Sequence, residues 1–259
     1  MSQLKFEKLF LLKEKQIMSI KTAMILAAGR GTRMRHLTDD KPKPLVQIAG
    51  TSLLGHILQK IKKQGITNVI INTCYKGEMI KEEVANQKDI SILFSDEETA
   101  LETGGGVKKA LSKLISLGDE NGFFVLNADP LWTEPHQTLL NQLQEAWNPE
   151  IMDILLAVVT IEKAYGDVPD GNYFIENGTL RRKKEHEHNI PYLFMGIQII
   201  HPRIFNTSLP DAFSLRDLYD KAQKEKRLAH IIFDGNWFHV GTPEAVKETE
   251  KLFAMEKNK

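Results

Sequence analysis

The sequence Thr22-Ala-Met-Ile-Leu-Ala-Ala-Gly-Arg-Gly-Thr-Arg33 leads from a short apolar run into a loop rich in glycine and arginine. The run 22–28 predicts a strand, and its nearly continuous apolar character is typical of a strand that a parallel sheet buries on both faces. In an open α/β sheet, ligands bind where the carboxyl ends of the strands meet. We therefore expect a binding site in the loop that follows.

Strand-like and helix-like segments alternate through the first half of the chain. Strands are predicted at 22–28, 68–74, 90–95 and 123–129, with helices between them. In the first helix Leu54, Ile57, Leu58 and Ile61 repeat at helical spacing, and Gly65 supplies a stop. This alternation predicts an α/β fold, with a mostly parallel central sheet and helices on both faces.

The second half is less regular. Strands are predicted at 153–160 and 191–200, with a hairpin over 172–182 that turns at Asn177-Gly178. These segments predict antiparallel strands added over the first half. No linker rich in proline or serine divides the chain, so we expect one domain over residues 21–259. We expect residues 1–20 to be an N-terminal extension. We favour Met18 as the true start, because the sequence that follows it is typical of the beginning of a domain.

Composition excludes several classes of protein. The 259 residues carry 34 basic and 34 acidic side chains, and this zero net charge argues against a chain that grips nucleic acid or an anionic membrane. The one cysteine, Cys74, excludes a disulfide scaffold and a cysteine zinc site within one chain. No apolar run approaches the roughly 18 residues of a membrane span. We expect a cytoplasmic protein, either a monomer or a small homo-oligomer.

The loop after the first strand has the features of a phosphate-binding segment. Gly29 and Gly31 let backbone N–H groups approach an anion, and Arg33 adds a planar fork that suits phosphate oxygens. Lys43 lies between Pro42 and Pro44, which hold it in an extended shape. The spacing matches neither the dinucleotide fingerprint nor the P-loop, which disfavours hydride transfer and ordinary P-loop hydrolysis.

These motifs carry a resemblance to a known family. The segments LAAGRGTRM and KPKPL, the run Leu101-Glu-Thr-Gly-Gly-Gly106, Asn127-Ala-Asp129 and Trp237-Phe-His-Val-Gly-Thr-Pro-Glu244 occur in the order found in sugar-1-phosphate nucleotidyltransferases. The chain resembles this family from residue 22 to about residue 250. Within it, the resemblance is greatest to the N-acetylmuramate-1-phosphate uridylyltransferases of cell-wall recycling, with the mannose-1-phosphate guanylyltransferases next. It implies a Rossmann-like nucleotidyltransferase fold.

The resemblance implies roles for individual residues. A nucleoside triphosphate and a sugar 1-phosphate are the implied partners, and Mg²⁺ the implied cofactor, with Mn²⁺ as an alternative. Catalytic roles fall to Arg33, Lys43 and Asp129, with Asp129 also holding the metal. Nucleotide-binding positions are Ala28, Gly29, Gly31, Thr32, Arg33, Lys43, Gly104 and Gly105. Sugar-binding positions are Asn127, Asp167 and Glu176.

His239 departs from the family pattern. Family members with a two-aspartate metal site have Asp-Val-Gly-Thr where this chain has His239-Val-Gly-Thr242. Imidazole is a poor ligand for Mg²⁺ but an acceptable one for Mn²⁺, Co²⁺ or Zn²⁺. Three interpretations stay open: Asp129, phosphates and water hold the metal; the site prefers a softer ion; or His239 only hydrogen-bonds a phosphate. We predict that Mn²⁺ supports turnover at least as well as Mg²⁺.

The implied activity is nucleotidyl transfer from a nucleoside triphosphate, with UTP and N-acetylmuramate 1-phosphate as the preferred pair. Alternatives with the same chemistry are GDP-mannose synthesis and cytidylyl transfer to a small phosphorylated alcohol. A different class is a catalytically weak regulatory protein that binds a nucleotide sugar. The run 183–188 is interpreted as a solvated surface rather than a metal site.

Overall fold

The structure is a computed structural model that describes residues 19–168 and 170–256. Apart from its last two residues, the expected extension at 1–20 lies outside the described residues, and so does Met18. Within the described part of the chain, every helix is too short or too polar to cross a membrane.

The strands and helices follow the predicted alternation. The strands are β1 (Thr22–Leu26), β2 (Gln47–Ile48), β3 (Thr51–Ser52), β4 (Asn68–Thr73), β5 (Ser91–Asp96), β6 (Phe123–Asn127), β7 (Pro130–Trp132), β8 (Ile154–Thr160), β9 (Ala164–Gly166), β10 (Tyr173–Glu176), β11 (Thr179–Arg182), β12 (Tyr192–Ile200), β13 (Leu228–Ile232) and β14 (Trp237–His239). The α-helices are α2 (Leu53–Lys63), α3 (Gly77–Val84), α4 (Glu102–Ser116), α5 (Leu139–Ala146), α6 (Leu215–Lys224) and α7 (Pro243–Glu256). Short 3₁₀ helices are η1 (Thr32–Thr38), η2 (Lys43–Leu45), η3 (Ile161–Lys163) and η4 (Pro202–Phe205).

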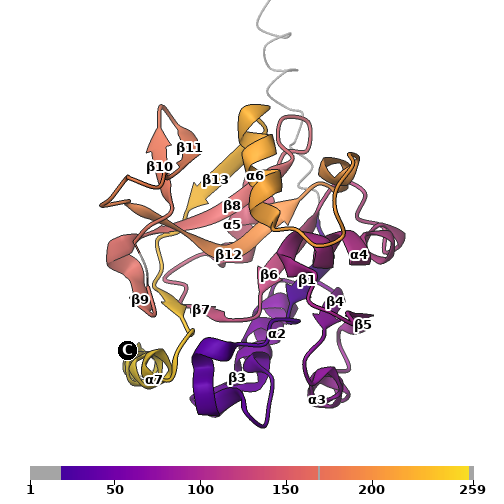
Figure 1. The fold of residues 1–259 in the computed structure, drawn as a ribbon, viewed down its shortest axis with the longest axis vertical. Helices are drawn as coiled ribbons and strands as arrows, with labels where there is room; N and C mark the ends of the chain where they lie inside the picture. The colour runs from indigo at the N-terminus through magenta and orange to yellow at the C-terminus, as the bar shows by residue number, and fades with distance from the viewer. Residues whose placement is uncertain (1–18, 169, 257–259) are drawn as a thin grey trace, which may run out of the picture.

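One mixed sheet forms the centre of the molecule (Figure 1). Strands β6, β1, β4 and β5 pair in parallel, so their carboxyl ends meet at one edge. Strand β12 then pairs antiparallel with both β6 and β8, and β13 pairs parallel with β8. The second-half strands therefore continue the first-half sheet instead of lying over it, because β12 bonds directly to the edge of β6. That part of the prediction was wrong.

Side chains alternate between the two faces of this sheet, and helices cover both. In β1, Ala23 and Ile25 belong to one buried cluster with Ile57 of α2 and Leu140 of α5. Met24 belongs to the opposite cluster, with Leu114 of α4 and Leu218 of α6. Apolar residues on both sides of each central strand explain the unbroken apolar runs in the sequence. The predicted α/β class, with helices on both faces, is confirmed (Figure 1).

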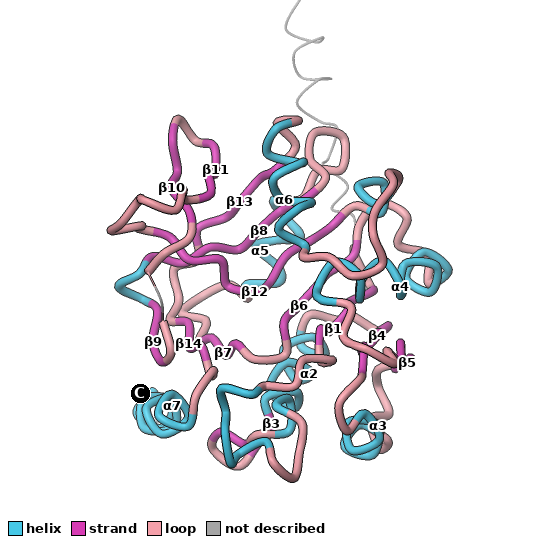
Figure 2. The backbone as a smooth tube through the Cα atoms, viewed as in Figure 1, coloured by secondary structure: helices cyan, strands magenta, loops and turns pink. Residues whose placement is uncertain are grey.

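A smaller three-stranded sheet, β7–β14–β9, lies beside the main one and packs against α7 (Figure 2). Its core joins Leu131 and Phe238 to Met34 of the glycine-rich loop. Helix α7 begins at Pro243, and Thr242 Oγ1 accepts the Ala245 N–H. The prediction contained no element between 130 and 150, where β7 and α5 lie, and none corresponding to β9. Only the tertiary pairing with β14 makes strands of β7 and β9.

The added hairpin is confirmed. Strands β10 and β11 pair antiparallel around Asn177 and Gly178, which both have positive φ, of 51° and 75°. Two consecutive left-handed residues match the twist of the flanking strands in a tight hairpin, and asparagine followed by glycine adopts that geometry at low cost.

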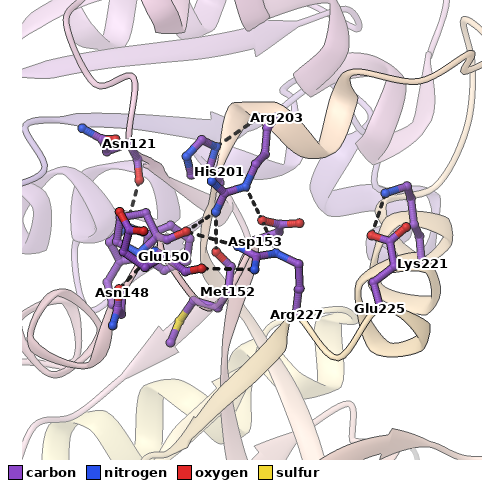
Figure 3. Close-up of polar contacts among 12 residues, drawn as sticks. Asn121, Asn148, Glu150, Met152, Asp153, His201, Arg203, Lys221, Glu225 and Arg227 are labelled. Carbon is purple, nitrogen blue, oxygen red and sulfur yellow. Dashed lines mark hydrogen bonds and ion pairs between the residues drawn. The ribbon is translucent and has the colours of Figure 1, made fainter.

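A cluster of ionic groups lies where β8 begins (Figure 3). Asp153, 6% exposed, accepts hydrogen bonds from the side chains of Arg203 and Arg227. Both guanidinium groups also donate to backbone carbonyls, including those of Pro149 and Glu150. Burial alone would raise the pKa of the Asp153 carboxyl, but the two arginines outweigh it and lower that pKa.

Candidate active site

A cavity opens at the carboxyl ends of β1, β4 and β6, where the sequence predicted a binding site. Its lining comes mostly from the loops that follow these strands, with a smaller contribution from the start of α4. The lining residues are Leu26, Ala27, Ala28, Gly29, Gly31, Thr32, Arg33, Lys43, Pro44, Asn72, Glu97, Ala100, Glu102, Thr103, Asn127, Ala128, Asp129 and Gly241. We refer to this as the first cavity.

The glycine-rich loop packs directly on Lys43, which begins the 3₁₀ helix η2 instead of the expected extended segment, because the Pro42 and Lys43 carbonyls accept the N–H groups of Leu45 and Val46. Gly31 has a φ of 67°, and a Cβ atom there would lie 2.7 Å from Cβ of Lys43. Only glycine combines that backbone angle with so close an approach. The backbone N–H groups of Gly29 and Thr32 have no hydrogen-bond partner among the described residues. The loop therefore offers free donors to an anion, as the sequence predicted.

Lys43 and Asp129 form an ion pair on the cavity wall. Lys43 Nζ lies 2.7 Å from Asp129 Oδ2, and the side chains are 12% and 24% exposed. Burial alone would raise the pKa of the Asp129 carboxyl, but the Lys43 ammonium and the His239 imidazole outweigh it and hold that pKa well below its usual value. Asp129 is therefore an anion at neutral pH, next to a fixed cation.

His239 points its second nitrogen at the same carboxylate. Its Nδ1 lies 2.6 Å from the backbone carbonyl oxygen of Asp167, which can only accept, so Nδ1 carries the proton in this contact. Nε2 lies 3.6 Å from Asp129 Oδ2, where its protonated form favours the carboxylate anion and its unprotonated form offers a lone pair to a cation. A carboxylate oxygen and an imidazole nitrogen at this separation fit two positions around one divalent cation. Among the described residues, no group of three or more His, Cys, Asp or Glu side chains is placed to hold a metal.

Arg33 is held by an acid from a distant part of the chain. Its Nη1 pairs with Asp167 Oδ2 while the Arg33 side chain stays 60% exposed. Gly241 completes this contact, because a Cβ atom there would lie 2.5 Å from Asp167 Oδ2 and 3.3 Å from Arg33 Nη1. The structure therefore places Asp167 beside Arg33, which lines the first cavity, and beside His239, although neither Asp167 nor His239 is itself part of that lining.

A buried polar network lies under the opposite wall. Asn72 Oδ1 accepts the Ala27 N–H at 2.7 Å, and Asn72 Nδ2 donates to Glu97 Oε1 at 2.7 Å. Glu97, 6% exposed, also accepts the Leu101 N–H through Oε2. The network ties β1, β4 and the loop before α4 together and fixes the shape of this wall.

A second cavity adjoins the first, and Thr103 and Asn127 line both. Gly196, with a φ of 78° at an irregularity in β12, makes room for Asn127, because a Cβ atom there would lie 2.8 Å from Asn127 Nδ2. The remaining lining residues are Asp170, Asn172, Tyr173, Arg182, Lys183, Phe194, Ser214, Leu215, Arg216 and Tyr219. Asn127 is thus placed where two bound groups would meet.

Three predicted positions lie elsewhere. Gly104 and Gly105 are buried in the first turns of α4, where both N–H groups donate to the Phe213 carbonyl, so they do not reach either cavity. Their place in the lining is taken by Glu102 and Thr103. Glu176 pairs with Arg181 at the hairpin and lines neither cavity.

Other lining residues were missed by sequence reasoning. Asn72 carries a visible signal, because it is a polar residue inside an apolar strand that ends at the ligand edge. Glu97 carries no local signal. Lys183 was assigned to a solvated surface run, but it lines the second cavity. Arg216 lies in a helix whose position relative to the hairpin only the folded chain defines.

Comparison with known proteins agrees with this geometry. The family model described as nucleotidyl transferase matches residues 22–255. An N-acetylmuramate alpha-1-phosphate uridylyltransferase from Caulobacter vibrioides is 34% identical over 239 residues, which cover 90% of this chain and 97% of the relative. A mannose-1-phosphate guanyltransferase from Gibberella zeae is 30% identical over 233 residues, which cover 85% of this chain and 60% of the relative.

The fold is also shared with solved structures. HddC from Yersinia pseudotuberculosis, crystallised with GMP-PN, superposes with a TM-score of 0.72 at 21% identity, covering 90% of this chain and all of the other. The family match extends over nearly all of the described chain. We conclude that the chain belongs to the nucleotidyl transferase family and is a sugar-1-phosphate nucleotidyltransferase.

Proposed function

We propose that this enzyme transfers a uridylyl group from UTP to N-acetylmuramate 1-phosphate, in the recycling of cell-wall sugar. The observation that carries the proposal is the position of Lys43 and Asp129 at a cavity that continues into a second one past Asn127. The Caulobacter vibrioides relative supports the choice of substrates, because the match covers almost its whole length. The guanyltransferase match covers only 60% of that relative.

The reaction needs position and charge more than proton transfer. An oxygen of the sugar 1-phosphate attacks the α-phosphorus of UTP, a new P–O bond forms, and the bond to the bridging oxygen breaks as pyrophosphate leaves. Both reactants are anions, so the protein must hold them in line and neutralise their charge. The free N–H groups of Gly29 and Thr32, together with Arg33, suit the triphosphate. Lys43 suits the transferring phosphate, and Asn127 suits a sugar hydroxyl.

Asp129 and His239 would hold a divalent cation, which supplies charge neutralisation at the phosphates. We propose Mg²⁺, with Mn²⁺ serving at least as well, because the donor pair includes an imidazole nitrogen. His239→Asp should move the metal preference of turnover toward Mg²⁺. Electron paramagnetic resonance can measure Mn²⁺ binding directly alongside turnover. His239→Ala removes the imidazole without supplying another ligand and should weaken Mn²⁺ binding, and an unchanged affinity for Mn²⁺ in His239→Ala would remove His239 from the ligand set.

A pyrophosphate-release screen tests the substrates. The four nucleoside triphosphates are crossed with N-acetylmuramate, N-acetylglucosamine and mannose 1-phosphates. We expect the fastest release with UTP and N-acetylmuramate 1-phosphate. Faster release with GTP and mannose 1-phosphate would favour the second candidate, a mannose-1-phosphate guanylyltransferase. Tight nucleotide binding without release for any pair would point to the regulatory role instead.

Other expectations stay predictions. We propose that residues 21–259 act as one catalytic domain and that residues 1–20 take no part in the reaction. We also propose a cytoplasmic location, where both substrates would be met, and a monomer or small homo-oligomer. Removal of residues 1–17 should leave turnover unchanged, as a steady-state comparison with the full chain can check.

A further inference from the structure

The second cavity combines an aromatic floor with a charged rim. Tyr173 and Tyr219 are buried, at 3% and 4% exposure, and the rings of Phe194 and Tyr219 meet edge to face at 5.6 Å. Burial raises the pKa of both tyrosines, so their hydroxyl groups stay neutral. Apolar ring faces of this kind suit the C–H face of a sugar, and the polar residues around them suit its hydroxyl groups.

The rim of this cavity is positively charged. Arg182, Lys183 and Arg216 line it, against one carboxylate, that of Asp170. Arg182 is already paired with Asp220, which lies outside the lining. Within the described part of the chain, the side chains of Lys183 and Arg216 make no hydrogen bond or ion pair. Two cations therefore remain available to a bound molecule.

The phosphate of the sugar 1-phosphate does not account for these two cations. In the proposed reaction this phosphate has to reach the α-phosphorus of UTP, and so it has to lie at the first cavity, where Arg33, Lys43 and Asp129 are found. Lys183 and Arg216 line only the second cavity. They come from two separate elements, the end of the β10–β11 hairpin and the first turn of α6, which share no sequence motif. Their convergence on one cavity fits a second anionic group on the substrate.

We infer that Lys183 and Arg216 bind a carboxylate carried by the sugar, so that the second cavity selects an acidic sugar 1-phosphate over a neutral one. This inference rests on the proposed function and narrows its substrate class. N-acetylmuramate has such a carboxylate on its lactyl substituent, whereas N-acetylglucosamine and mannose have none. An arginine and a lysine together supply charge-assisted donors for its two oxygens.

The first test compares two ligands on the unaltered protein. UDP-N-acetylmuramate and its lactamide, in which the carboxylate is replaced by a neutral amide of nearly the same shape, are titrated by calorimetry. Because both cations are solvent-accessible, we expect about tenfold tighter binding of the acid, shrinking as salt is raised. Equal affinities, or no detectable binding of either ligand, would overturn the inference.

The second test uses variants at the rim. Lys183→Gln and Arg216→Gln should each lower the preference for the acid about threefold, and the double variant should remove it, with affinity for the lactamide unchanged. Lys184→Gln is the matched control, since Lys184 is the next residue, is exposed and lines neither cavity. A double variant that folds, as judged by circular dichroism, and keeps the full preference contradicts the inference.

Turnover separates this inference from the proposed function. If the acid binds preferentially but UTP and N-acetylmuramate 1-phosphate release no pyrophosphate, the proposed reaction fails and the carboxylate site stands. If pyrophosphate forms equally fast with N-acetylmuramate 1-phosphate and its lactamide, and the two UDP-sugars also bind alike, the reaction stands and the carboxylate site fails.

Discussion

Two carboxylates in this molecule each lie between two nitrogen-bearing partners, yet their surroundings differ. Asp153 is 6% exposed and accepts from Arg203 and Arg227, which also donate to backbone carbonyls (Figure 3). Asp129 is 24% exposed and lies between Lys43 and His239 on the wall of a cavity.

The difference shows how to tell a structural ion cluster from a reactive one. Around Asp153 the arginine side chains donate to other groups of the protein. They therefore link the start of β8 to η4, through Arg203, and to the residue before β13, through Arg227. Around Asp129, the carboxylate and Lys43 both line a cavity that a ligand can enter, and His239 Nε2 lies 3.6 Å from that carboxylate. A lysine and an acid held at 2.7 Å beside such a space are set up to exchange partners when an anion or a metal binds.

The largest expected effect is on the stability of the protein when Asp153, which binds Arg203 and Arg227, is replaced. Asp153→Ala removes the common acceptor of two arginines, and we expect a loss of about 3 kcal/mol in the free energy of unfolding, measured in urea. Turnover per folded molecule should stay close to that of the parent protein. Asp234→Ala is the control, because Asp234 pairs with Lys163 at the exposed surface and its loss should change the stability far less.

At Lys43 and Asp129 we expect the change to appear in catalysis and not in stability. Lys43→Ala should lower kcat at least about 100-fold, equivalent to about 2.7 kcal/mol in transition-state stabilisation. The reason is that the variant lacks the positive charge that stabilises the transferring phosphate. Asp129→Ala should lower kcat by a similar factor. Lys41→Ala, a change in the same proline-rich segment but outside the cavity lining, should stay within about twofold of the parent. Near-normal kcat in Lys43→Ala would remove the proposed role.

Acidification should lower the stability of the region around Asp153 by protonating His201, before Asp153 itself is protonated. Burial and the nearby Arg203 lower the pKa of His201 to about 4, and its neutral Nδ1 accepts the Arg203 N–H. A folded-state pKa below the unfolded value of about 6.5 means that the unfolded chain binds the proton first, so stability falls as pH drops from about 6.5 to about 4.

We expect a loss of about 1–2 kcal/mol over that range, allowing for partial exposure of the ring. Urea unfolding at a series of pH values measures it. His201→Asn keeps a side-chain acceptor at the start of η4 but cannot titrate, so its profile should be flatter. A parent profile as flat as that of His201→Asn would mean that the proton binds both states alike.

The smallest effect is expected where an acid positions a ligand-binding side chain. Asp167→Asn keeps the shape of the partner of Arg33 but removes its charge. We expect a rise of about threefold in KM for the nucleoside triphosphate, with kcat nearly unchanged, because Arg33 loses its fixed position more than its ability to bind. Glu244→Gln, which releases the exposed Arg35 in the same loop, is the control. An equal fall in kcat would place Asp167 among the groups that act in the transition state.

Much of the site could be predicted because its features are local. The strand 22–28, the glycine at 31, Lys43 between two prolines and Asp129 after a strand are each recognisable from short segments of sequence. Where the structure gives a predicted residue contacts that the sequence did not indicate, those contacts are distant along the chain. Asp167 was assigned to the sugar, but the pairing of β9 with β14 carries it to Arg33. Gly104 and Gly105 were assigned to the nucleotide, but their N–H groups bond to Phe213, which lies more than 100 residues further along the chain.

The amino-acid sequence by itself determined the alternation of buried strands and covering helices, and with it the edge of the sheet where a ligand binds. Apolar periodicity and glycine placement act over a few residues, so they can be read without the fold. The composition of the second cavity was decided only by the tertiary structure. Lys183 and Arg216 meet there because β10 pairs with β12, which puts the hairpin in the main sheet, and α6 packs against β11. No local pattern encodes such a long-range contact.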